Sequence, residues 1–105
     1  MELLLTVDNH FLVKDRGLVI TPDLDRPRSF LFIPFREQVV IQSPDRDAIT
    51  LTAEFNVVLF VIGREDDPRI VIMFPEGSKE LIPIGSQVFV TQELSQYLKG
   101  EYHNP

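Results

Sequence analysis

Apolar and polar side chains alternate without interruption over residues 49–56, and this alternation limits the segment to a β-strand. The apolar members are Ile49, Leu51, Ala53 and Phe55. Successive side chains of a strand point to opposite sides, so these four share one face while threonine, glutamate and asparagine occupy the other. A strand of this kind belongs to a sheet that covers a core on one side and contacts water on the other.

From residue 57 to residue 62 the same segment is apolar on both faces. One straight strand over 49–62 would be about 45 Å long at about 3.3 Å per residue, too long for a small domain. We therefore expect a bend, bulge or break at 54–56. Shorter strand-like runs are separated by segments rich in proline, glycine and aspartate, which form turns. These runs are residues 2–7, 11–13, 18–21, 30–33, 38–42, 69–74 and 87–91.

One helix is expected at residues 91–99. Thr91 can cap its first turn, Glu93 suits the positive end of the helix dipole, and Gly100 can adopt the left-handed conformation after Lys99. The face that should pack on the sheet consists of Leu94, Tyr97 and Leu98. The expected fold is all-β: a small barrel of six to eight strands, closed or nearly closed, with a short C-terminal helix. It forms one domain over 1–100, and 101–105 is a frayed tail. An SH3-like or OB-like barrel is the alternative.

Composition excludes several classes of protein. The chain of 105 residues is 44% apolar and 25% charged, which is typical of a globular domain rather than a disordered one. It has no cysteine, so thiol catalysis, disulfides and thiolate metal sites are excluded together. The acidic start over 1–8 does not fit a signal peptide, and no apolar run approaches the roughly 20 residues of a membrane helix. We expect a cytoplasmic protein that does not enter a membrane.

Several segments, taken in order, resemble the β-barrel second domain of translation GTPases of the elongation factor Tu type. Residues 10–20 contain a phenylalanine, a short strand, Arg16-Gly17 and an apolar strand. Residues 38–41 match the strand that follows, and 70–74 match a later apolar strand. Residues 77–88 contain Gly77, a turn with Lys79 and Glu80, and Gly85 before the closing strand. The resemblance covers about residues 10–90. It implies the barrel fold, with Ile82 and Ile84 filling one barrel end and Lys79 and Glu80 exposed to water.

The same comparison limits the function that the resemblance implies. Residues 22–35 replace the glycine-rich hairpin of the family with proline, arginine and phenylalanine, and no phosphate-binding loop occurs anywhere in the sequence. The chain is therefore not expected to be a GTPase. In the family this barrel contacts aminoacyl-tRNA, the ribosome or neighbouring domains, roles that depend on the GTPase domain.

Catalytic groups are scarce. The two histidines are His10, at a strand start, and His103, in the expected tail. Acidic clusters occur at 23–25, 45–47 and 65–67, but the spacing of a calcium loop is absent and arginines lie within or beside the last two. Solvated turns explain these clusters, although weak divalent-cation binding stays open. We expect no enzyme activity, no cofactor, no catalytic residue and no metal site.

A binding role is favoured because two segments are apolar on both faces, so that one face of each needs a cover. That cover is either another part of the chain or a partner, which includes a second copy. The candidate partner-binding residues are Phe30, Phe32, Val58, Phe60 and Ile62. The first hypothesis is a non-enzymatic binding module or small adaptor that engages a protein partner or itself.

The alternative is an RNA- or ribosome-associated barrel. A net charge of −6 disfavours nucleic acid in general, because phosphates are repelled by an acidic surface. The candidate RNA-binding residues are the arginines Arg16, Arg26, Arg28 and Arg36.

Overall fold

The structure is a computed structural model that describes residues 1–25, 34–58 and 69–99. It contains seven strands and one helix in these ranges: β1 (Glu2–Thr6), β2 (Asn9–Val13), β3 (Gly17–Asp25), β4 (Phe35–Gln42), β5 (Ile49–Val58), β6 (Arg69–Phe74), β7 (Gln87–Val90) and α1 (Gln92–Leu98). The prediction of a mostly β chain of six to eight strands with one C-terminal helix is confirmed.

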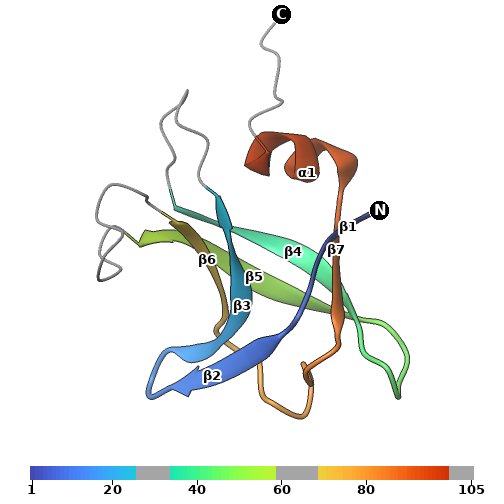
Figure 1. The fold of residues 1–105 in the computed structure, drawn as a ribbon. Coiled ribbons are helices and arrows are strands. Elements are labelled where there is room, and N and C mark those ends of the chain that lie inside the picture. The colour runs from blue at the N-terminus through green and yellow to red at the C-terminus, as the bar shows by residue number, and fades with distance from the viewer. Residues whose placement is uncertain (26–33, 59–68, 100–105) are drawn as a thin grey trace, which may run out of the picture.

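The strands form one antiparallel sheet with the order β1-β7-β4-β5-β6-β3-β2. The sheet curls around an apolar core, and α1 lies across one end of it (Figure 1). No ladder joins β1 to β2 in the described ranges, so the sheet is a half-barrel and full closure is not observed.

The two edge strands are nevertheless consecutive in the chain. Val7, between them, donates its N–H to the carbonyl of Ser86 at 2.8 Å and accepts the N–H of Gly85 at 2.8 Å. Asp8 then donates its N–H to the carbonyl of Thr21, on the β3 side, at 2.9 Å. One bent segment therefore pairs first with the β7 side of the sheet and then with the β3 side.

The core consists of the inward-facing residues of these strands. The largest fully buried side chains are Phe55, Phe74, Leu18, Ile20, Ile41, Ile70, Ile72, Ile82, Val7, Val39, Val88 and Val90. The alternation that defined β5 is confirmed, because Ala53 and Phe55 are fully buried while Ile49 and Leu51 pack against the core. Burial of one such large side chain contributes about 1.5–3 kcal/mol, so the inward faces dominate the stability of the sheet.

Of the bend, bulge or break expected at 54–56, the bulge and the break are wrong. Strand β5 keeps a continuous register with β4 through Phe55 and with β6 from Glu54 to Val58. Residues 59–62 lie outside the described ranges.

Strands β3 and β4 are longer than predicted. The polar residues Arg36 and Glu37 hide the start of β4, which pairs with β5 residue by residue. In β3, the register with β6 shifts between Ile20 and Leu24, which accommodates Pro22. Pairing with neighbours overrides local propensity in both cases. The strand expected at 30–33 lies outside the described residues.

The helix follows its prediction closely. The Thr91 hydroxyl accepts the N–H of Leu94 at 3.1 Å, which satisfies one free donor of the first turn. Leu94 and Leu98 are buried in the core and Tyr97 packs against it. Lys99 is the C-cap itself, one position beyond the turn in which it was expected.

Of the two isoleucines expected to fill one barrel end, only Ile82 does so, at the end opposite α1. Ile82 is fully buried, whereas the Ile84 side chain is 54% exposed. Lys79 and Glu80 are exposed, as expected.

The β2–β3 hairpin is held tightly against the end of β6. Asp15 has φ 64° in its tight turn, and Arg16 donates its N–H to the Val13 carbonyl at 3.0 Å. Gly17 has φ 123°, and a Cβ there would meet the carbonyl oxygen of Phe74 and stand 2.7 Å from the Cα of Pro75. Only glycine fits this position, because both the backbone angle and the space exclude a side chain.

We predict that Gly17→Ala lowers the free energy of unfolding by about 3 kcal/mol, since strain and a backbone clash add. Gly85→Ala is the matched control. Gly85 also has a positive φ, 95°, but the nearest atom to a Cβ there is 3.5 Å away on the Pro44 ring. Its cost should be about 1 kcal/mol. Urea denaturation of both variants measures the difference, and equal costs would contradict the close approach at Gly17.

Candidate functional site

A row of outward-facing side chains crosses five strands of the sheet. Direct pairing places Phe11 of β2 opposite Val19 of β3, and Val19 opposite Met73 of β6. Met73 pairs with Glu54 of β5, which pairs with Arg36 of β4. The row is apolar on three strands and becomes an ion pair on the other two. Met73 is only 7% exposed although it faces outward, so its neighbours already exclude most water from it.

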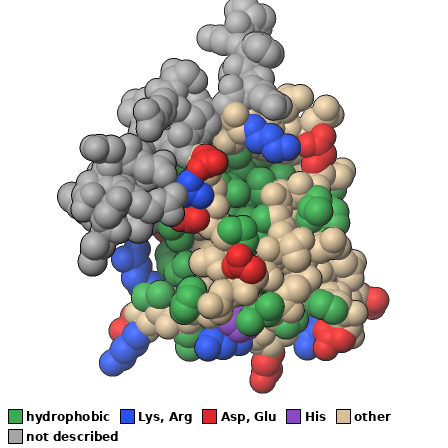
Figure 2. All heavy atoms as spheres, viewed as in Figure 1, with side chains coloured by type: hydrophobic (Ala, Val, Ile, Leu, Met, Phe, Trp, Pro, Cys, Tyr) green, Lys and Arg blue, Asp and Glu red, His purple; other side chains and the backbone are tan. Residues whose placement is uncertain are grey.

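A groove of about 690 Å³ lies at this row, beside the β2–β3 hairpin. Its lining residues are Leu12, Val13, Lys14, Asp15, Arg16, Gly17, Arg36, Glu54, Met73, Pro75 and Gly77. The hairpin supplies one wall, the outer faces of β4, β5 and β6 contribute the polar and apolar floor, and the segment after β6 supplies the remainder. Hydrophobic side chains reach the surface over β2 and β3, with basic side chains beside them (Figure 2).

Three consecutive apolar residues on β2 are exposed. Phe11 is 49% exposed, Leu12 66% and Val13 37%. Strand β2 is the last strand of the sheet order, so no strand in the described part of the chain pairs with its second edge. We call this unpaired side of Asn9–Val13 the β2 edge. Natural edge strands are usually protected by charge, proline or a bulge, and β2 has none of these.

Charges surround the groove in both signs. Arg36 Nη2 lies 3.4 Å from Glu54 Oε2, with the Arg36 side chain 65% exposed and that of Glu54 20% exposed. Lys14, Asp15 and Arg16 are exposed at the hairpin tip. Because Glu54 and Asp15 offset two of the three cations, the groove is locally positive by one charge on a chain of net charge −6.

The structure places the predicted site residues as follows. Arg16 and Arg36 line the same groove, although they are far apart in sequence. Val58 ends β5, and nothing is described of its side chain. The other candidates, Arg26, Arg28, Phe30, Phe32, Phe60 and Ile62, lie outside the described residues.

Sequence reasoning missed the exposure of Phe11, Leu12 and Val13. Residues 11–13 were identified as a strand, but its place at the sheet edge depends on long-range pairing. The available signal was local: three large apolar residues in a row cannot all face a core from one strand.

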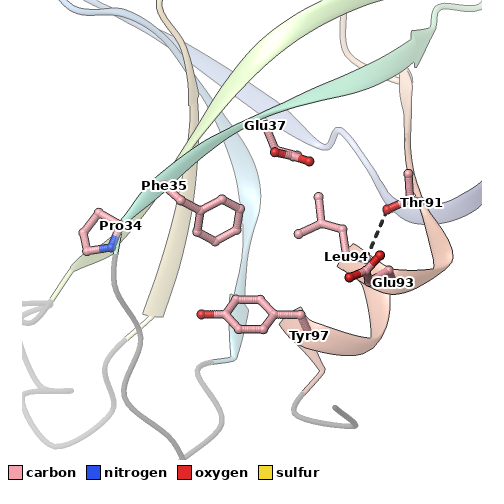
Figure 3. Close-up of a pocket in the computed structure, with 7 residues that line it drawn as sticks. All are labelled: Pro34, Phe35, Glu37, Thr91, Glu93, Leu94 and Tyr97. Carbon is pink, nitrogen blue, oxygen red and sulfur yellow. Dashed lines mark hydrogen bonds between the residues drawn. The ribbon is translucent and has the colours of Figure 1, made fainter. Parts of the chain in front are cut away.

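A second hollow, of about 450 Å³, lies between β4 and α1. The Phe35 and Tyr97 rings line it in edge-to-face contact, their centroids 5.8 Å apart at 76°, and Phe35 also stacks on the buried Phe55 at 4.8 Å. Leu94 lies beside them, and Glu37 and Glu93 enter from β4 and α1 (Figure 3). The hollow therefore has an apolar floor with two carboxylates among its lining residues.

His10 and the acidic cluster at 23–25, both considered as candidate chemical groups, make structural contacts in the described part of the chain. His10 Nδ1 donates to the carbonyl of Ile82 at 2.9 Å, which ties β2 to the segment before β7. Asp23 and Asp25 both bind Arg69, whose side chain is 13% exposed, so this acidic pair joins β3 to β6 and is not a solvated turn. His103 lies outside the described ranges.

Over residues 1–25, 34–58 and 69–99, no group of three or more histidine, aspartate or glutamate side chains is placed to hold a metal ion. In the same ranges, no helix is long and apolar enough to cross a membrane.

Comparisons with protein-family models, curated proteins and solved structures find no match to this chain.

The Arg36–Glu54 pair should be weak, because its arginine is well exposed to water. We predict a coupling free energy below about 1 kcal/mol in a double-mutant cycle with Arg36→Met and Glu54→Gln, and a smaller value in high salt. Urea denaturation of the four proteins measures it. A coupling above about 2 kcal/mol would show that Arg36 is committed to Glu54 and is not free to meet a ligand.

Proposed function

We propose that this chain is a non-enzymatic protein-binding module that captures an extended protein segment along the β2 edge. The observation that carries the proposal is the run of exposed apolar residues Phe11, Leu12 and Val13 on a strand with one unpaired edge. An added strand would satisfy the free backbone groups of β2, while its side chains would cover the apolar row.

The chemistry of the site defines the segment that fits. Side chains of an added strand alternate between the two faces of the sheet, so every second residue would lie beside Phe11 and Val13 on the outer face. These residues should be apolar. At the hairpin end the partner would meet Lys14 and Arg16, which favours a carboxylate there.

The fold supports a second part of the proposal, namely that the half-barrel is a relative of the second domain of translation GTPases. The segments that suggested this resemblance fall on the β2–β3 hairpin, on β4, on β6 and on the turn and strand before α1. A cytoplasmic location belongs to the same proposal and is supported by the absence of cysteine from the sequence.

A phage-displayed library of random peptides tests the binding role. We predict that the chain enriches peptides with alternating apolar residues and an acidic residue at one end. Phe11→Lys should reduce their binding at least tenfold, because the apolar row is interrupted at its exposed end. Thr52→Lys, at an exposed position on β5, is the control and should bind them normally. Equal enrichment on all three proteins, or none on any, would contradict the proposal.

The structure favours one specific form of the RNA alternative, because Arg16 and Arg36 share one groove with Lys14. If RNA is the ligand, a labelled single-stranded RNA should bind at low salt and be released as salt rises. The double variant Arg16→Gln/Arg36→Gln should bind more weakly, whereas Lys79→Gln, an exposed lysine outside the groove, should not. Our proposal predicts no RNA binding by the unmodified chain at low salt.

A further inference from the structure

We infer that the segment which occupies the β2 edge is the β2 strand of a second copy of this chain, so that the protein forms a two-fold symmetric dimer. This inference rests on the proposed function and names its partner.

The first step is the symmetry of the pairing. In a two-fold dimer the same surface meets itself, so a residue i that contacts j is matched by j contacting i. Two identical edge strands satisfy this condition when they run antiparallel. Residues directly opposite each other then lie on the same face of the joint sheet, which means that outward residues of β2 meet outward residues of the other copy.

The second step is the register. The outward residues of β2 are Asn9, Phe11 and Val13, because their partners on β3 are Thr21, Val19 and Gly17. A two-fold axis at Phe11 sets the two Phe11 side chains opposite each other. The apolar row of one copy, Met73-Val19-Phe11, then continues directly into the row of the second copy. Side chains that are half exposed in one chain become covered in the pair.

The third step is charge. With the axis at Phe11, Asp8, the residue before β2, lies opposite Lys14, the residue after it and the first of the hairpin turn, and the symmetry makes this pair twice. Both residues are exposed in the single chain, where the Asp8 carboxylate accepts a hydrogen bond from the Thr21 hydroxyl and keeps further lone pairs for a cation. Opposite charges placed directly across two strands stabilise the pair, and like charges destabilise it. The segment 8–13 thus has the acidic end and the alternating apolar residues that the β2 edge requires.

An axis at the neighbouring residue does not provide the same match. Centred on Leu12, the pairing would set Phe11 opposite Val13, an apolar match, but it would set Lys14 opposite His10, whose Nδ1 is already bonded to the Ile82 carbonyl. Centred on His10, it would set Phe11 opposite the polar Asn9. The axis at Phe11 is therefore selected by charge, because of the three it alone places Lys14 opposite Asp8.

Disulfide cross-linking tests the dimer and its register in one experiment, because the chain has no cysteine of its own. Directly opposite residues of an antiparallel pair have Cα atoms about 4.5–5.5 Å apart, within the range of a disulfide. Two copies of Phe11→Cys should therefore form a disulfide with each other under mild oxidation at micromolar protein concentration. Val13→Cys is the matched control, because it faces outward on the same strand. With the axis at Phe11, position 13 of one copy lies opposite position 9 of the other, four residues away from the second cysteine. We expect cross-linking at Phe11→Cys to be at least tenfold faster.

A charge exchange followed by sedimentation velocity gives an independent measurement. Asp8→Lys and Lys14→Asp should each weaken dimerisation about tenfold, because each places like charges opposite each other twice. The double variant Asp8→Lys/Lys14→Asp should restore it. Circular dichroism verifies that each variant is folded.

The dimer is overturned if the unmodified chain sediments as a monomer throughout the micromolar range. It is also overturned if Phe11→Cys cross-links no faster than Val13→Cys, or if Leu12→Cys cross-links in its place. The proposed function is judged separately, because a monomer whose peptide binding is lost in Phe11→Lys still captures extended segments at the β2 edge. If the chain is a monomer and also binds no peptide that depends on Phe11, both proposals are wrong.

Discussion

The backbone hydrogen bonds of Val7 and Asp8 determine the shape of this protein. Val7 bonds to Gly85 and Ser86 on one side of the chain, and Asp8 bonds to Thr21 on the other. The first segment thereby pairs with both ends of the sheet, which forces the seven strands to curl around the core. The same bend directs the backbone of β2 away from β7, so the β2 edge is left without a partner strand in the described residues. The buried interior and the exposed edge are two results of one geometrical constraint.

Only part of this arrangement is written locally in the sequence. The alternation over 49–56 identifies β5 and its inward face, and Thr91 with the apolar face of α1 identifies the helix. These features depend on neighbours in the chain, so sequence reasoning can find them. The polar start of β4 and the proline in β3 hide the ends of two predicted strands, residues 35–37 and 22–25, which are extended because β5 and β6 pair with them. Local propensity does not reveal these ends.

The sequence indicated that apolar side chains would be exposed, but it did not indicate which residues these are. Excess apolar surface suggested a binding face, and the exposed apolar run among the described residues is Phe11, Leu12 and Val13, none of which was singled out for binding. The difference arises because edge and centre strands have the same local sequence pattern, and only the order of strands separates them. For the arginines, two residues 20 positions apart, Arg16 and Arg36, meet because β2, β3, β6, β5 and β4 are neighbours in the sheet.

The tight hairpin between β2 and β3 has a consequence for how the chain can vary. Its turn is held by Asp15 and by the contact of Gly17 with the end of β6, so the pairing of Phe11 with Val19 is fixed. One residue inserted at 14–16 would move β2 along β3 by a single position. Such a slip exchanges the two faces of a strand. His10 and Leu12 would turn outward, while Phe11 and Val13 would turn toward the interior. The length of this short loop therefore decides which side chains the protein presents to its surroundings.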